Sequence, residues 1–333
     1  MQDDTGQPLH NPHDRFFKEI FGRPDVALEL FHAHLPPGLS AMIGQRTLAL
    51  EPANFVDEWL AEYMSDLLFS VRLQGEGLHL YLLFEHRSTP LARMPLRLLS
   101  YMVRIWERWS KGAKAGERPP CIIAMVLHQG GEQWWVSPRF HDWLGMPEAV
   151  RRELGRFEPD FEYGLIDLSR IPLEELVGRL VSELALSLMK AVREDRLEEW
   201  LERCESALAE LVTNPDKAGI FRTMMRYAFA VEGKSPSTVE RFVARVENQR
   251  VREGVMSIAE ELIQRGRQEG RQEGRQEGRQ EGEQRGRLEG RVQLCQQLLG
   301  LPVMAGEELG GKGSAELERL LAELESRLRQ RVK

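Results

Sequence analysis

Two short apolar stretches joined by a turn constrain the fold of this chain more than any other feature. Ser65–Leu73 and His79–Arg87 are rich in Leu, Phe and Val, and Gln74-Gly-Glu-Gly77 lies between them. Such a pattern predicts a β-hairpin. If Gly75 and Glu76 form the centre of the turn, the numbers of facing residues sum to 151, which places Asp66 opposite Glu85.

Each predicted strand carries a carboxylate, in Asp66 and Glu85, among residues of the buried type. Directly opposed residues have Cβ atoms about 4.5–5.5 Å apart, and two carboxylates that close repel each other unless a cation lies between them. Residues two apart on a strand share a face, so Arg87 points the same way as Glu85 and His86 points the other way.

Two interpretations of this pair follow. In the first, Asp66, Glu85 and the backbone carbonyl of His86 bind a hard cation such as Mg²⁺, with Mn²⁺ or Ca²⁺ as alternatives, because hard cations favour oxygen ligands. In the second, Asp66 caps the entrance of its strand and Glu85 forms a buried ion pair with Arg87 or Arg97.

The stretch Met94–Trp109 has apolar residues at helical spacing and predicts a long amphipathic helix. Basic residues follow one face of it: Arg93, Arg97, Arg104, Arg108 and Lys111. This stripe is either a solvated helix face or a surface that neutralises phosphates of nucleic acid. The formal net charge of the chain is −7, so nucleic-acid binding would have to use such a local patch.

Helical and strand-like segments alternate through residues 1–171 and predict an α/β domain. Asp14–His34 indicates two helices with a break at Gly22-Arg-Pro24, Cys121–Leu127 indicates a strand buried on both faces, and Phe161–Leu168 is a further strand candidate. Residues 172–250 contain only helical patterns, broken by Asn214-Pro215 and by Gly233-Lys-Ser-Pro236.

A Gly-Arg-Gln-Glu repeat dominates residues 251–293. Residues four apart in it are like-charged and every fourth residue is glycine, which costs about 1 kcal/mol of helix stability each time. The repeat is therefore expected to be a linker or a marginal helix, or an element that becomes ordered on self-association. Residues 294–333 form a C-terminal helical segment, through which the chain is expected to form homo-oligomers.

The apolar runs, the cysteines and the N-terminal sequence argue against a membrane protein and against a secreted protein. The longest apolar runs fall far short of the roughly 20 residues that span a bilayer, so no membrane partner is expected. Cys121, Cys204 and Cys295 lie far apart, and the N-terminus lacks the features of a secretory signal. Together these observations predict a cytoplasmic protein with reduced thiols.

Several motifs in order give a more specific prediction. His13–Phe21, Glu62–Val71, Tyr81–Thr89 and Arg97–Met102 together resemble the recombination-promoting nuclease and transposase family of the PD-(D/E)XK nuclease superfamily, over about residues 10–250. The resemblance implies a core of a helix, three strands, a helix and a further strand. It also implies metal-dependent DNA endonuclease activity, which hydrolyses phosphodiester bonds in recombination or transposition.

Carried onto this chain, the resemblance makes Asp66 and Glu85 metal ligands, with Asp14 or Glu19 of the first helix as additional candidates. The third position of the motif is usually Gln in the family and Lys in the superfamily, whereas this chain has Arg87. Arginine stays protonated and cannot shuttle a proton. The alternative is therefore a catalytically weak or inactive protein that keeps the nuclease fold as a DNA-binding or oligomeric scaffold.

Overall fold

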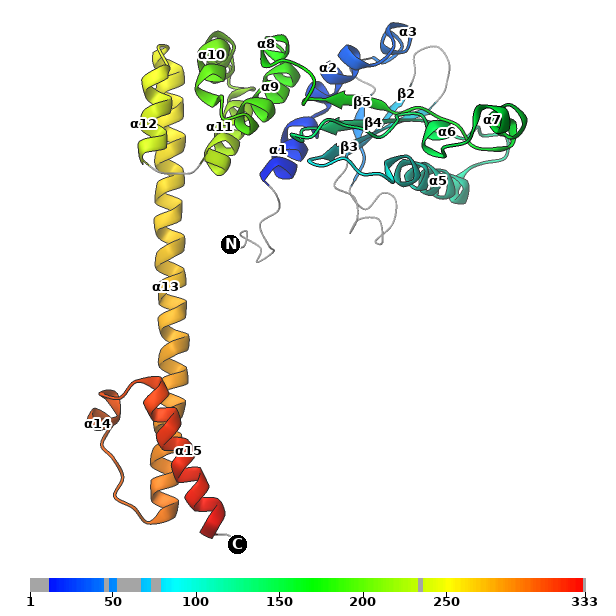
Figure 1. Cartoon of the computed structure of the whole chain (residues 1–333). Coiled ribbons are helices and arrows are strands. Elements are labelled where there is room, and N and C mark those ends of the chain that lie inside the picture. Colours follow the sequence, from blue (N-terminus) through cyan, green and yellow to red (C-terminus); the bar gives the residue numbers. More distant parts are fainter. Residues whose placement is uncertain (1–11, 45–47, 53–66, 73–78, 233–235, 332–333) are drawn as a thin grey trace. The chain divides into compact units, whose positions relative to one another are not determined.

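The computed structural model describes residues 12–44, 48–52, 67–72, 79–232 and 236–331 (Figure 1). The chain divides into two compact units, Met1–Glu260 and Glu261–Lys333. The first unit contains the α/β part and the helical region that follows it. The regular elements described in the second unit are all helices.

The first elements described in this unit are the helices α1 (Pro12–Phe21), α2 (Pro24–His34) and α3 (Pro37–Ser40). Proline occupies the first position of each, where its missing N–H costs no hydrogen bond. The predicted break between the first two helices is confirmed. Gly22 fits there because a Cβ atom at this position would lie 2.3 Å from the carbonyl oxygen of Lys18.

Within the described residues, five strands form one sheet in the order β1-β2-β3-β4-β5. Their bounds are β1 (Ala49–Leu50), β2 (Leu67–Arg72), β3 (His79–Arg87), β4 (Cys121–His128) and β5 (Gly164–Asp167). β1, β2 and β3 pair antiparallel, whereas β4 and β5 continue the sheet parallel to β3.

The predicted hairpin register is confirmed for the described pairs. Leu67 pairs with Phe84 and Arg72 with His79, so facing residues have numbers that sum to 151. Asp66 and the predicted turn at residues 75–76 lie outside the described residues.

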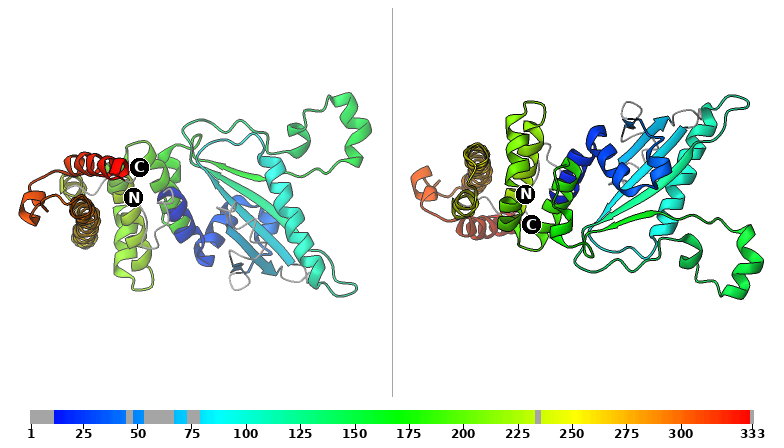
Figure 2. Two further views of the ribbon diagram at one scale, coloured as in Figure 1. Left: turned by 90° about the horizontal axis from the view of Figure 1, so that it is seen from below. Right: turned by 90° about the horizontal axis from the view of Figure 1, so that it is seen from above.

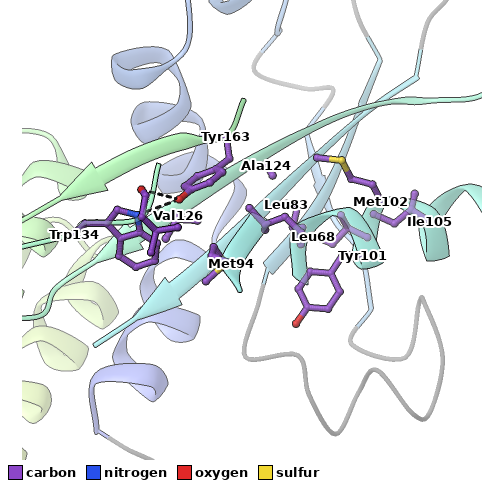
Figure 3. Close-up of a cluster of buried hydrophobic side chains, with 12 residues drawn as sticks. Leu68, Leu83, Met94, Tyr101, Met102, Ile105, Ala124, Val126, Trp134 and Tyr163 are labelled. Carbon is purple, nitrogen blue, oxygen red and sulfur yellow. Dashed lines mark hydrogen bonds between the residues drawn. The ribbon is translucent and has the colours of Figure 1, made fainter. Parts of the chain in front are cut away.

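Helix α5 (Met94–Gly112) connects β3 to β4 and covers one face of the sheet (Figure 2). Its Leu98, Met102 and Ile105 pack with Leu83 and Val126 in the hydrophobic core drawn in Figure 3. The first two helices cover the opposite face, where Phe17 and Phe21 contact Phe84 with ring centroids 4.9 and 5.7 Å apart. Burial on both faces explains the uninterrupted apolar sequence of the central strands.

The remaining helices of the first unit follow the sheet strands. They are α6 (Phe140–Trp143), α7 (Glu148–Leu154) with the 3₁₀ turn η1 (Gly155–Phe157), α8 (Leu173–Leu176), α9 (Val181–Arg193), α10 (Leu197–Thr213), α11 (Ala218–Glu232) and α12 (Pro236–Arg245). The helical region predicted for residues 172–250 packs on the N-terminal helices, since Phe16 of α1 stacks on Tyr227 of α11 with centroids 4.1 Å apart.

The Gly-Arg-Gln-Glu repeat is helical throughout. It lies within α13 (Gln249–Leu299), which is followed by α14 (Gly306–Gly310) and α15 (Ser314–Arg331). Of the two expectations for the repeat, a linker or a marginal helix, the structure shows a helix. Ion pairs four residues apart occur where the repeat becomes irregular, between Arg279 and Glu283 and between Arg285 and Glu289.

A small core closes the end of the second unit. Val292, Cys295, Leu317, Leu321 and Leu324 are buried between the end of α13 and α15. None of the described helices combines the length and the apolar character that crossing a membrane requires.

Candidate metal and nucleic-acid site

Glu85 lies near the carboxyl end of β3, where the ends of the parallel strands β3, β4 and β5 share one edge of the sheet. Ligand sites in α/β sheets favour this edge. The Glu85 side chain points toward α5 and is 0% exposed. A carboxylate this deeply buried needs compensating positive charge or a metal ion.

Two guanidinium groups lie next to the Glu85 carboxylate. The Nε atom of Arg97 on α5 is 2.8 Å from Oε1, and a terminal nitrogen of Arg87 is 3.8 Å from the same oxygen. Both predicted ion pairs are therefore present. Neither carboxylate oxygen receives a hydrogen bond of regular geometry from the described residues, and Oε2 takes part in neither ion pair.

Because Oε2 has no hydrogen-bond partner among the described residues, this carboxylate oxygen is available to a further ligand. An oxygen donor of this kind fits a hard cation such as Mg²⁺. In the part of the chain that the structure describes, no three His, Cys, Asp or Glu side chains gather as metal ligands would. Asp66 lies outside that part, so its role as a metal ligand stays a prediction.

His86 points to the opposite face of the sheet, as the alternation along the strand predicts. Its ring stacks on Phe17 with centroids 5.0 Å apart, and Nδ1 lies 4.0 Å from an oxygen of Asp14. Burial lowers the pKa of His86 to about 3, against the opposing effect of a hydrogen bond with Gln129. The imidazole is therefore neutral at physiological pH.

The two acidic candidates of α1 differ in placement. Asp14 lies beside His86 and also forms an ion pair with Lys18 at 3.1 Å. Glu19 pairs with Arg15 at 2.8 Å, and both of these side chains are exposed. Asp14 therefore lies next to His86 near the end of β3, whereas Glu19 forms its ion pair with Arg15 on the exposed surface of α1.

The turn after β4 places residues next to the end of β3 that were not predicted from the sequence. The backbone N–H of Gln129 donates to the carbonyl oxygen of Arg87 at 3.0 Å, and the side chains of His128 and Gln129 are buried. Gly130 packs so closely that a Cβ atom would lie 2.1 Å from the His128 ring. The Gly130-Gly131 pair directly after an apolar strand was the available signal for this turn.

The basic residues of α5 divide into two groups. Arg97 turns toward the sheet, where its guanidinium pairs with Glu85 and lies 5.2 Å from the centre of the Tyr101 ring. Arg104 is half-buried and pairs with Glu107 at 3.1 Å. Arg93, Arg108 and Lys111 are exposed.

The fold and the site define a class: a mixed α/β protein with a buried acidic residue at the edge where its parallel strands end. Residues 11–231 match the family model described as "Putative transposase, YhgA-like", and the chain belongs to this family. This match confirms the family resemblance predicted from the sequence motifs.

Curated relatives agree with this assignment. From Escherichia coli (strain K12), the inactive recombination-promoting nuclease-like protein RpnE is 28% identical over 266 residues, which are 79% of this chain and 85% of the relative. The recombination-promoting nuclease RpnA of the same strain is 28% identical over 263 residues, covering 77% of this chain and 85% of the relative.

A third relative, the recombination-promoting nuclease RpnC of that strain, is 26% identical over 208 residues, covering 62% of this chain and 67% of the relative. No solved structure matches the chain.

Proposed function

We propose that this protein is a metal-dependent DNA endonuclease that hydrolyses phosphodiester bonds in recombination or transposition. The observation that carries the proposal is the fully buried Glu85 carboxylate, whose Oε2 atom lacks a partner among the described residues. Relatives named recombination-promoting nucleases support it. The described order of N-terminal helices (α1–α3), the strands β1, β2 and β3, helix α5 and strand β4 also supports it, since the resemblance implies a helix, three strands, a helix and a further strand.

In this proposal Asp66, Glu85 and the carbonyl oxygen of His86 hold Mg²⁺, without Asp14, which lies beside the His86 ring on the opposite face of the sheet. Mn²⁺ or Ca²⁺ could bind the same oxygens. When bound, the cation would lower the pKa of a coordinated water and stabilise the leaving oxygen.

The arginines of the site would act on the substrate. Arg87 would stabilise negative charge on the phosphate, and it cannot serve as a general base because it stays protonated. Arg93, Arg104, Arg108 and Lys111 would neutralise neighbouring DNA phosphates, which makes DNA binding sensitive to salt.

Cleavage of supercoiled plasmid tests this function. We expect the full chain to nick or linearise the plasmid with Mg²⁺ or Mn²⁺, and an Asp66→Ala variant to lose at least about a hundredfold in rate, because a metal ligand is gone. The products are followed by gel electrophoresis, with EDTA as a further control. If wild type and variant leave the plasmid equally intact with several divalent metals, the enzyme proposal is wrong.

A catalytically weak or inactive nuclease-fold protein that binds DNA or acts as an oligomeric scaffold is the second candidate. Two features favour it: Arg87 stands at the third motif position, and both guanidinium groups contact Oε1 of Glu85. The relative RpnE is itself named inactive. Metal-independent binding of a DNA duplex, together with an uncut plasmid, would support this candidate.

A further inference from the structure

Arg97 makes the closer of the two contacts with Glu85, at 2.8 Å against 3.8 Å for Arg87. It extends from the first turn of α5, and the ring of Tyr101, one turn further along, lies beside its guanidinium. The Arg97 side chain is 21% exposed, whereas Glu85 is 0% exposed. The Arg97 side chain therefore contacts the buried carboxylate and is itself partly exposed to solvent.

The positive charge of Arg97 opposes the binding of a cation to the Glu85 carboxylate. A buried carboxylate without a counter-charge is costly, and the two arginines provide that charge in the structure. A divalent cation on Glu85 would place further positive charge beside two guanidinium groups and would repel them. Of the two, Arg97 has the closer contact to lose.

We propose that Arg97 is a positioning residue that pairs with Glu85, as the structure shows, and moves to a DNA phosphate when a divalent cation binds Glu85. This inference rests on the proposed function. A guanidinium suits the exchange because it forms bidentate hydrogen bonds with phosphate as well as with carboxylate. Cation binding and DNA binding then strengthen each other by the same factor, as linkage requires.

The Arg97→Met variant tests the exchange, because it keeps the apolar stem and removes the charge. Mn²⁺ binding to the full chain is measured by calorimetry, and we expect the variant to bind Mn²⁺ about tenfold more tightly than wild type, since no guanidinium competes for Glu85. Arg151→Met is the matched control. It removes an arginine that pairs with Asp142 at 3.1 Å outside the site, and it should bind Mn²⁺ as wild type does.

The coupling is measured separately, by fluorescence anisotropy with a nuclease-resistant phosphorothioate DNA duplex. Mn²⁺ should tighten duplex binding by wild type and by Arg151→Met more than by Arg97→Met, which keeps only the contact of the cation itself with the phosphate. If Arg97→Met fails to fold by circular dichroism, Arg97→Lys replaces it, with an expected Mn²⁺ affinity between wild type and the tenfold gain.

Asp66→Asn separates this inference from the proposed function. If Asp66→Asn loses Mn²⁺ binding while the Arg97 variant binds Mn²⁺ as wild type does, the metal site stands and the exchange is wrong. Duplex binding by the Arg97 variant that tightens with Mn²⁺ as much as that of wild type also overturns it. If none of the proteins binds Mn²⁺, the exchange and the proposed metal-dependent function both fail.

Discussion

At the scale of single residues, buried polar groups in this protein fall into two kinds. Tyr163 is 1% exposed, and its hydroxyl oxygen accepts a hydrogen bond from the indole N–H of Trp134 at 3.1 Å (Figure 3). Asp167 is likewise satisfied, by the backbone N–H groups of Trp134 and Ser169. Glu85 differs, because one of its oxygens has no partner among the described residues. Satisfied groups stabilise the fold. Glu85 is one of several buried groups with an atom that lacks a hydrogen-bond partner among the described residues, and its place at the ends of the parallel strands makes it the candidate site.

Tyr163→Phe tests the structural role of the first kind. Burial raises the pKa of Tyr163 to about 12, so at pH 10–12 the phenol ionises in the unfolded chain before it does in the native one. The wild type should therefore lose stability as the pH rises through this range. At pH 8 the variant should have a free energy of unfolding lower by about 1–2 kcal/mol, because the N–H of Trp134 loses its acceptor.

Urea unfolding at pH 8, 10 and 11 measures both effects. The variant should lose less stability between pH 8 and pH 11 than wild type does, because its residue 163 no longer titrates. Equal losses in the two proteins would show that Tyr163 does not carry the alkaline pH dependence.

At the scale of elements, α13 is a helix although the Gly-Arg-Gln-Glu repeat within it has a low helix propensity. The regular repeat offers no oppositely charged pairs at helical spacing, and its glycines weaken the helix. A Cβ atom at any of Gly266, Gly270, Gly274, Gly278, Gly282, Gly286 or Gly290 would find nothing within 4 Å. The repeat is thus a helix of low intrinsic stability, and its glycines are replaceable without steric conflict.

Gly274→Ala and Gly278→Ala should each stabilise this part of α13 by about 1 kcal/mol, because alanine loses less conformational entropy in a helix. The measurement is limited proteolysis with trypsin, which cleaves after the arginines of the repeat when the helix opens. Gln276→Ala is the control, since glutamine is already a good helix former. Cleavage of the glycine variants at the wild-type rate would contradict the expectation.

At the scale of the whole molecule, the second unit exposes apolar side chains beyond its own core. Leu294 and Leu298 are 54% and 60% exposed, and both continue the row of every fourth residue that the glycines of α13 occupy. Large exposed apolar side chains on one helix row are typical of interaction surfaces. They support the proposal that the chain forms homo-oligomers through its C-terminal helices.

The double variant Leu294→Ser/Leu298→Ser should weaken self-association of the full chain about tenfold or more, because less apolar surface is removed from water on association. Sedimentation equilibrium measures the dissociation constant. Leu154→Ser, at a residue of α7 that is 47% exposed in the other compact unit, is the matched control. A monomeric wild-type chain, or an unchanged constant in the double variant, would exclude this surface.

The sequence predicted the local parts of the fold well, and for a clear reason. The turn composition around residues 75–76 specified the strand register, and Gly22-Arg-Pro24 specified the helix break, since both depend on residues close together in the chain. It predicted less about α13, because the repeat has weak local preferences in either direction.

Side-chain partners over longer distances could not be predicted in the same way. Helical spacing placed Arg97 in a stripe with Arg93, Arg104, Arg108 and Lys111, and a spacing argument alone cannot say which side of a helix faces the sheet. The buried turn at Gln129 and Gly130 likewise depends on how β4 lies beside β3.

By itself, then, the sequence determined the hairpin register, the alternation that sends Glu85 and His86 to opposite faces, and the family to which the chain belongs. The register and the alternation follow from local turn geometry and from the period of two along a strand. The family follows from the order of the sequence motifs. Only the tertiary structure decided that Arg97 and Arg87 share one oxygen of Glu85 and leave the other without a partner among the described residues. That arrangement depends on the packing of α5 against the sheet. This packing buries the carboxylate, and a buried carboxylate without a positive partner would lower the stability of the fold.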